Sequence, residues 1–232
     1  MTLHNCATQK DRDVSNQLTR CWAEVGKIRR ILKDVVPADL SRLGIVGVSG
    51  SAALHWYQHD LMVGPQWGPP KAVDVFVCMN DYDYASFVSS FRKALHKLCH
   101  AFAIGKHSMP ASFSGPEHTV NRVRLLGFRA EICLVQSRCA SLTTTVRRFN
   151  SNVNRVIYDI HECTHKVEDA VRCAIERGVV IIQNMSFTDN TMHDIACICQ
   201  TIIAATKHRR RGFRIQNHGG VIFYGAPNAA SA

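Results

Sequence analysis

Two short stretches of the chain contain residues that could hold a phosphate and a metal ion. Residues 44–54 read GIVGVSGSAAL, in which Gly50 and Ser51 follow a short apolar, β-branched run. A glycine–serine turn between a buried strand and a helix exposes backbone N–H groups that can bind a phosphate. Residues 71–77 read KAVDVFV, with Asp74 as the only acid. Because such an aspartate is costly to bury unless it is paired or bound to metal, Asp74 lies at a strand end or has a function.

A third stretch, HECTH at 161–165, matches the H-E-x-x-H pattern of zinc proteases. In that pattern two histidines one helical turn apart bind the metal, and the glutamate activates a water molecule. The pattern needs a continuous helix, whereas HECTH directly follows a predicted strand and lacks a G-x-x-H continuation. A zinc metalloprotease is therefore a minor alternative, and a strand-to-helix turn with solvent-facing His161 and Glu162 is favoured.

The apolar pattern predicts the elements that position these residues. Apolar residues at helical spacing indicate a long helix over 14–36, ended by Pro37. Runs rich in β-branched residues indicate strands, and amphipathic runs indicate helices. The predicted strands are 44–48, 72–79, 119–128, 129–136, 152–160 and 179–183, and the other predicted helices are 51–62, 84–98, 166–177 and 189–207. Residues 103–118 are expected to be irregular, and 213–217 is expected to form a hairpin with 219–225.

The net charge of +10 is unevenly spread, and its densest cluster is KHRRRGFR at 207–214. This cluster is supported by Arg29 and Arg30, Arg122 and Arg124, and Arg147 and Arg148. A strongly basic balance favours polyanionic partners, namely nucleotides or nucleic acid. A solubilising face or a targeting signal is the alternative for a charge run. Few aromatic residues interleave with the cluster, so base stacking on it is not indicated.

The ten cysteines include no C-x-x-C pair, which argues against a disulfide framework. Five of them fall among apolar residues: Cys21, Cys78, Cys99, Cys133 and Cys173. We expect these thiols to be buried and reduced, which favours the cytoplasm or the nucleus. No segment is apolar for long enough to cross a bilayer and the first residues do not form a secretory signal, so no membrane partner is expected.

The order of a G-S turn, a helix, a W-and-P loop and an acidic strand resembles the nucleotidyltransferase superfamily of the DNA polymerase β type. The resemblance is greatest to its small divergent members from viruses and fungi. Gly50 and Ser51 match the G-S pair, and Asp74 matches the second acid of the D-x-D strand. The loop match consists of Trp67, Pro69 and Pro70. The closing segment ATKHRRRGFRI also resembles the family, and the likeness spans roughly residues 41–215.

The chain departs from the family at its acids. In the family, two acids of D-x-D and a third from an adjacent antiparallel strand hold two Mg²⁺ ions that orient attack on the α-phosphate of a nucleoside triphosphate. Ala72 stands at the first of these positions, and Asn150 replaces a further expected aspartate. Glu131 is the best match for the third acid. Since a methyl group cannot bind Mg²⁺, the resemblance implies weak or absent transfer.

We therefore expect an α/β (α+β) fold, with a nucleotidyltransferase-like mixed sheet flanked by helices and a helix-rich second half. The expected parts are an N-terminal helix packed on the core (1–40), the nucleotidyltransferase-like core (41–140) and a C-terminal α/β extension of the same domain (141–232). The expected function is that of a divergent, degenerate nucleotidyltransferase, a pseudoenzyme that binds nucleotide or RNA phosphates. The alternative is a non-catalytic basic nucleic-acid-binding or adaptor protein.

The resemblance also assigns roles to individual residues. Asp74 and Glu131 would be the catalytic acids and the ligands of any Mg²⁺. Gly50 and Ser51 would hold the phosphates of a nucleoside triphosphate. The counter-charge would come from Arg209, Arg210 and Arg211.

Overall fold

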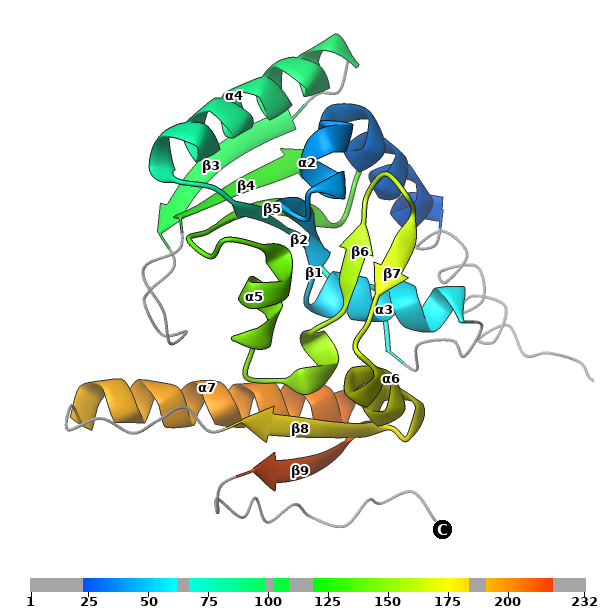
Figure 1. Ribbon diagram of the computed structural model, residues 1–232, viewed down its shortest axis with the longest axis vertical. Helices are drawn as coiled ribbons and strands as arrows, with labels where there is room; N and C mark the ends of the chain where they lie inside the picture. The colour runs from blue at the N-terminus through cyan, green and yellow to red at the C-terminus, as the bar shows by residue number, and fades with distance from the viewer. Residues whose placement is uncertain (1–22, 62–66, 99–101, 109–118, 184–190, 219–232) are drawn as a thin grey trace, which may run out of the picture.

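The computed structural model describes residues 23–61, 67–98, 102–108, 119–183 and 191–218 of the 232-residue chain. In these residues the protein is a mixed α/β structure, with a seven-stranded sheet flanked by helices and a separate two-stranded sheet (Figure 1). The fold class expected from the sequence is confirmed.

The large sheet has the strand order β3-β4-β5-β2-β1-β6-β7. Its strands are β1 (Val46–Ser49), β2 (Ala72–Cys78), β3 (Phe102–Ser108), β4 (Thr119–Leu125), β5 (Glu131–Ser137), β6 (Ile157–Asp159) and β7 (Thr164–Lys166). Strands β2 and β5 run parallel, and the other neighbouring pairs of this sheet are antiparallel. Strands β6 and β7, which follow residue 141, thus belong to the same sheet as the earlier strands.

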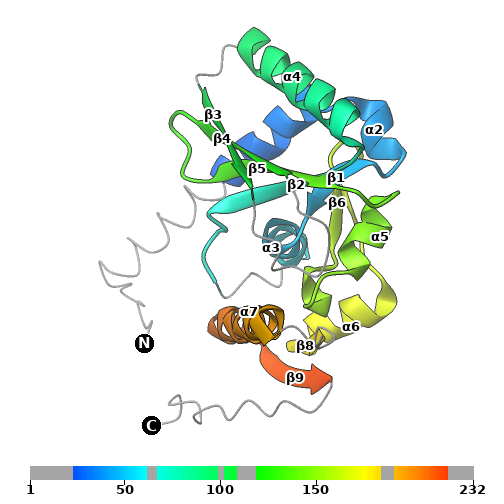
Figure 2. The ribbon, with the colours of Figure 1, turned by 90° about the vertical axis from the view of Figure 1, so that its left-hand side faces the viewer.

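Helices lie on both sides of this sheet (Figure 2). The described helices are the segment 23–35, α2 (Ala38–Arg42), α3 (Ser51–Asp60), α4 (Asp81–Lys97), α5 (Leu142–Arg147), α6 (Asp169–Glu176), α7 (Thr191–Arg210) and the 3₁₀ turn η1 (Asn152–Asn154). Helix α4 lies above the sheet in both views, whereas α5 and α7 lie below it. None of the described helices is long and apolar enough to span a bilayer.

The two faces of β2 differ in burial, as period-2 alternation requires. Val73, Val75 and Val77 are buried in the main core, together with apolar residues of α4 and of the segment 23–35. Asp74 and its same-face neighbours are half-buried on the other face. The buried valines of β2 thus face the part of the core that contains α4 and the segment 23–35, and Asp74 lies on the opposite face of the strand, toward α7.

Two regions differ from the sequence-based expectation. Residues 102–108 form β3 instead of an irregular segment, because their backbone pairs along its length with β4. Residues 152–160 were expected to be one strand, but they form η1 and then the short β6, which turns back into β7. The helix expected at 166–177 begins later, at Asp169.

The small sheet pairs β8 (Val179–Gln183) with β9 (Arg214–His218) in parallel. The expected strand at 179–183 is confirmed, whereas the partner expected for 213–217, residues 219–225, lies outside the described residues. The start of the 14–36 helix also lies outside them, and 23–35 is helical as expected.

The cysteines also depart in part from expectation. Cys78 and Cys133 are buried, as predicted. Cys173 is exposed, because α6 buries Val171, Ala174 and Ile175 and turns the residue between them outward. Cys21 and Cys99 lie outside the described residues.

Candidate functional site

The turn between β1 and α3 is built around Gly50. Gly50 is the N-cap of α3, with φ 75° and ψ −142°, a conformation that L side chains rarely adopt. Its N–H donates to the carbonyl oxygen of Asn154 at 3.2 Å, and the buried Ser49 hydroxyl donates to the carbonyl oxygen of Val156 at 2.7 Å. Ser51 is the first residue of α3, whose leading N–H groups have no partner within the helix. The turn is therefore held by the chain before β6.

Asp74 lies directly beside this turn. In the pairing of β1 with β2, Asp74 is the partner of Ser49, the residue before Gly50. A Cβ placed on Gly50 would lie 3.6 Å from Asp74 Oδ2. The structure thus brings together the turn and the acid that the sequence places more than twenty residues apart.

Asp74 belongs to a row of paired residues that crosses four strands. Arg122 of β4 pairs with Cys133 of β5, Cys133 with Asp74, and Asp74 with Ser49. Burial raises the pKa of the Asp74 carboxyl, while Lys207, Arg122 and a hydrogen bond with Cys133 oppose that rise. Burial and the neighbouring Asp74 also raise the pKa of the Cys133 thiol to about 12. The neighbour of Asp74 on β5 is therefore a protonated thiol and not an acid.

Glu131 lies in the next row of the same sheet face. It pairs with Ala72. Its strand, β5, runs parallel to β2, so the antiparallel orientation that the family resemblance predicted for the strand of the third acid is wrong. Glu131 Oε1 accepts a hydrogen bond from Arg124 Nε at 2.9 Å, and the two side chains form an ion pair. Glu131 thus lies opposite the missing acid and is already engaged by an arginine.

These donors do not fit a two-ion magnesium site. No group of three or more His, Cys, Asp or Glu side chains in the described part of the chain is placed to hold a metal ion. Around Asp74 the neighbours are a thiol and cations, and Glu131 is bound to Arg124. Since Mg²⁺ requires several oxygen ligands in a near-octahedral arrangement, no metal-dependent step follows from this arrangement.

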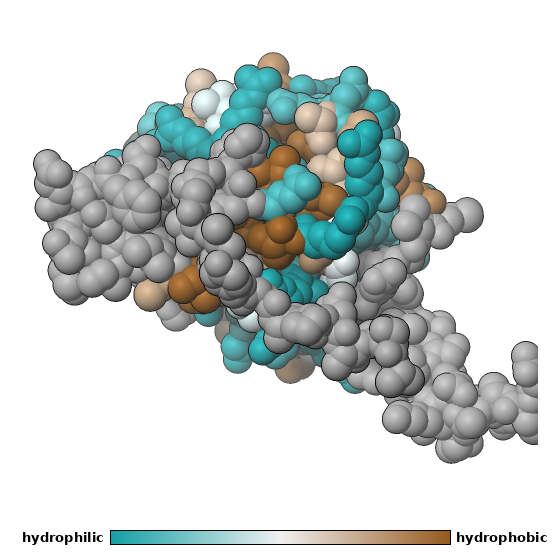
Figure 3. Space-filling model, turned by 90° about the horizontal axis from the view of Figure 1, so that it is seen from below, coloured by the Kyte–Doolittle hydropathy of each residue, from teal (hydrophilic) through white to brown (hydrophobic). Residues whose placement is uncertain are grey.

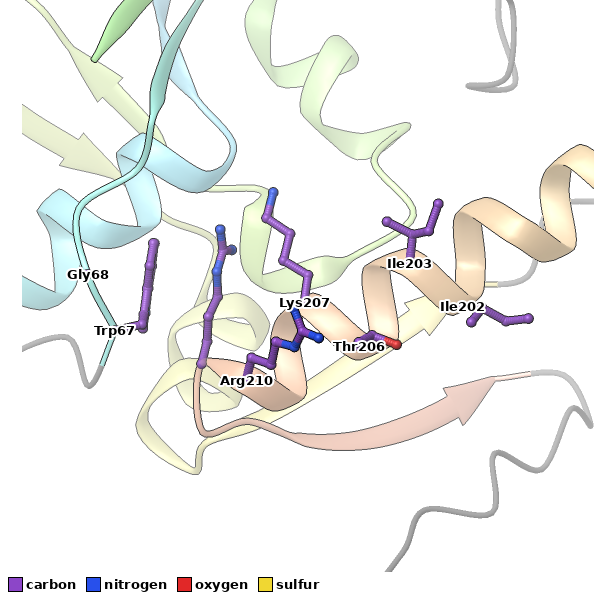
Figure 4. A pocket seen from close by; sticks show the side chains of 8 residues that line it. Trp67, Gly68, Ile202, Ile203, Thr206, Lys207 and Arg210 are labelled. Carbon is purple, nitrogen blue, oxygen red and sulfur yellow. The ribbon is translucent and has the colours of Figure 1, made fainter. Parts of the chain in front are cut away.

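An open pocket of about 450 Å³ lies between α7 and the loop before β2 (Figure 4). Its described lining includes Trp67, Lys207, Arg210 and Arg211, and it includes no acid. The Arg211 guanidinium lies 3.9 Å from the centroid of the Trp67 ring. Burial lowers the pKa of Arg211 to about 10, and its Nη1 atom has no hydrogen-bond partner among the described residues. The exposed Arg209 does not line the pocket.

Lys207 connects this pocket with Asp74. Although Lys207 is exposed overall, desolvation of its amine and the nearby Arg211 lower its pKa, and Asp74 raises it. In Figure 4 its side chain extends from α7 away from Arg210 and toward the large sheet. Lys207 therefore both lines the pocket and acts electrostatically on Asp74.

Helix α3 fixes the position of Trp67. The Trp67 indole N–H donates to Gln58 Oε1 at 3.1 Å. The Trp67 ring and the buried His55 ring pack in a T-shaped arrangement, with their centroids 4.6 Å apart. The same helix therefore begins at the glycine turn and supports the aromatic wall of the pocket. His208, on the buried side of α7, makes a hydrogen bond with the Ser151 hydroxyl at 2.9 Å and anchors that helix.

The HECTH segment is a hairpin turn between β6 and β7, and not a helix. His161 Nε2 lies 2.6 Å from the carbonyl oxygen of Val36, and Asp159 Oδ1 accepts from the N–H groups of His161 and Glu162. His165 Nδ1 lies 3.7 Å from Asp60. Because the two histidines do not share a helical face, the geometry that a zinc protease requires is absent from this segment. The expected strand-to-helix turn is likewise corrected to a strand-to-strand turn.

Sequence reasoning missed three residues that surround Asp74. Cys133 was interpreted as a small hydrophobe, although its alternation with Glu131 could have indicated the same sheet face. Arg122 was counted only among the basic residues that favour a polyanionic partner. Lys207 begins the basic cluster, but its approach to Asp74 depends on the packing of α7 under the sheet, which no local pattern encodes.

No known protein family and no curated protein matches this sequence. Among solved structures, a chain described as a tRNA-processing enzyme in an apo form is similar, with 14% sequence identity and a TM-score of 0.46. The match covers 78% of this chain and 45% of the solved chain, so this protein spans less than half of that enzyme. Similarity at this level does not extend to individual site residues or to function.

Proposed function

We propose that this protein is a divergent nucleotidyltransferase-like protein that binds nucleotide or nucleic-acid phosphates and transfers nucleotidyl groups weakly or not at all. The observation that carries the proposal is the position of Gly50 beside Asp74, with the first turn of α3 directly after it. Helix N-termini and consecutive backbone N–H groups bind anions readily. In this proposal Gly50 and Ser51 contact a phosphate.

Protein cations supply much of the counter-charge in this proposal. Lys207 and Arg122 act electrostatically on Asp74, and Arg210 and Arg211 line the adjoining pocket. Hydrogen bonds between such cations and phosphate oxygens are among the strongest in proteins. Asp74 and Glu131 are the acids that a Mg²⁺ ion would have to use, and titration with and without the ion tests whether it contributes to phosphate binding.

The weak-transfer part of the proposal rests on the acids. Ala72 provides no ligand, and Glu131 is paired with Arg124. Because metal positioning supplies much of the rate in this kind of reaction, we expect no robust transfer of label from an α-labelled nucleoside triphosphate to RNA. Efficient transfer would overturn this part and leave the binding site intact.

Isothermal titration with each nucleoside triphosphate tests phosphate binding. Lys207→Met is expected to weaken binding about 10- to 150-fold, the range for loss of a charged hydrogen bond of roughly 1.5–3 kcal/mol. The matched control is Lys93→Met, an exposed position of α4 on the other side of the sheet, which should bind like the parent. Equal losses in both variants would show that net charge alone is responsible.

A non-catalytic adaptor is the second candidate, and the pairing of Glu131 with Arg124 favours it. This candidate predicts nucleic-acid binding without nucleoside triphosphate binding. The substitution Ala72→Asp separates the two, since it restores an acid next to Asp74 on the same strand face. It should increase Mg²⁺ affinity in a vestigial transferase site, and unchanged affinity would contradict the assignment of β2 as the acidic strand.

A further inference from the structure

The pocket beside Trp67 is formed by one face of the last two turns of α7. Ile202, Thr206 and Arg210 follow one another at intervals of four residues, and Ile203 and Lys207 form the adjacent row. Such spacing places residues on one side of a helix. From the first to the last of these residues the face is about 12 Å long at 1.5 Å per residue. It passes from apolar to polar to basic along its length.

The basic end of this face lies beside a buried guanidinium group whose charge has no anionic partner among the described lining residues. Arg211 is 9% exposed, stacks on Trp67, and has a buried Nη1 atom without a partner among the described residues. A buried cation without a paired anion is costly, and none of the described lining residues is acidic. Arg210 and Lys207, on the last turn of α7, line the same pocket. A phosphate would satisfy this group, since planar guanidinium groups match phosphate oxygens in geometry.

The other end of the face is apolar and open to solvent. Ile202 is 46% exposed and Ile203 is 59% exposed, within the same pocket as the three cations. Seen from below, hydrophobic and hydrophilic side chains lie next to one another on this side of the protein (Figure 3). A ligand that fits both ends carries anionic groups and exposed flat apolar groups. A single-stranded nucleic acid has both, whereas a duplex buries the faces of its bases.

We propose that this pocket binds a single-stranded polynucleotide, with a backbone phosphate at Arg210 and Arg211 and a base on Ile202 and Ile203. The inference rests on the proposed function, since Lys207 would place the strand next to the Gly50 turn. It goes further by naming a nucleic-acid strand, and not a free nucleotide, as the ligand of this pocket. The pocket would supply phosphate contacts in addition to those at the turn.

Fluorescence anisotropy with a fluorescein-labelled oligo(U) RNA and the full chain tests the proposal. Arg210→Gln should weaken binding about tenfold and lower the slope of log affinity against log salt by about 0.7, the value for one lost phosphate contact on a single strand. Arg209→Gln removes the same charge one residue away, outside the pocket lining, and should cost less than about twofold. Ile203→Ser should weaken the single strand and leave binding of duplex RNA unchanged.

Three results would overturn the inference. Equal losses in Arg209→Gln and Arg210→Gln would indicate diffuse charge attraction. Duplex RNA that binds as tightly as the single strand would exclude the role of the isoleucines. ATP binding weakened by Arg210→Gln as strongly as RNA binding would assign the pocket to a mononucleotide. In the last case the proposed function stands, whereas a parent protein that binds neither nucleoside triphosphates nor RNA removes the proposed function itself.

Discussion

Replacement of Gly50 by alanine tests the turn on which the phosphate assignment rests. The φ of 75° and ψ of −142° at Gly50 lie in a region that is open in practice to glycine, and a residue held there is strained by about 1–3 kcal/mol. A steric clash adds little, because the new Cβ would lie 3.6 Å from Asp74 Oδ2, an ordinary contact. Gly50→Ala should therefore lower the free energy of unfolding by about 1–3 kcal/mol, or about 2–4 °C in Tm for each kcal/mol.

The same variant should weaken phosphate binding, because a turn that relaxes toward negative φ reorients its N–H groups. Urea unfolding followed by circular dichroism, together with titration of a nucleoside triphosphate, measures both effects. Gly26→Ala is the matched control, since Gly26 is exposed in the helical segment 23–35 and its Cβ would meet nothing within 4 Å. It should stabilise the protein by about 0.5–1 kcal/mol. A Gly50→Ala protein as stable as its parent would refute the positive φ and, with it, the assigned turn.

Three further predictions concern stability. Asp74→Asn should raise the free energy of unfolding by about 0.5–2 kcal/mol above about pH 5. The reason is that burial raises the pKa of this carboxyl, so its charged form opposes folding as pH rises. Urea unfolding at several pH values measures the effect, and a variant less stable than the parent would contradict it. Gly47→Ala should destabilise by about 1–3 kcal/mol, since its Cβ would lie 2.7 Å from Leu142 Cδ1 and 3.2 Å from the Tyr158 carbonyl oxygen; a thermal melt unchanged from the parent would mean that both neighbours move freely. Burial lowers the pKa of His55 and of His165 to about 4, and it lowers the pKa of His208 to about 3. The stability that these neutral histidines contribute should be complete above about pH 6.5 and should decline as pH falls toward 4, because the unfolded chain takes up protons first. His208→Gln should make the decline of the urea midpoint with falling pH less steep. An unaltered slope would contradict this assignment to His208.

Local patterns were sufficient for the elements around Gly50 and Asp74. The apolar runs predicted the strands at 44–48 and 72–79 and the helix at 51–62, and the structure places Asp74 opposite the buried valines of β2. The segment 102–108 escaped prediction because it lacks such alternation, and its strand structure comes from pairing with β4. The β6–β7 hairpin escaped it for a different reason. Its turn is closed by Asp159, whose carboxylate accepts hydrogen bonds from two backbone N–H groups. The spacing of apolar residues gives no indication of such a hydrogen bond.

The pocket could not be predicted from local patterns. Trp67 was assigned to a family loop, and Arg211 to a charge cluster, without any reason for the two to meet. Their contact depends on α7 packing beneath the large sheet, which His208 and Ser151 help to fix. Long-range contacts of this kind are specified by the whole fold and not by spacing within one segment. Net charge indicated a polyanion, but only the packing separates Arg210 from its neighbour Arg209.

The acids on this sheet face are compensated by protein cations. Glu131 is paired with Arg124 in one row, and Asp74 lies in the electrostatic field of Arg122 and Lys207 in the next. A carboxylate that already has a cation gains less from a metal ion, since the ion must compete with that cation for the same oxygen atoms. The side chain of Ala72, which provides no carboxylate, and the engagement of Glu131 and Asp74 by arginine and lysine therefore act in the same direction. Together they favour a surface that binds phosphate through its own cations, which is the opposite of a site that depends on bridging metal ions.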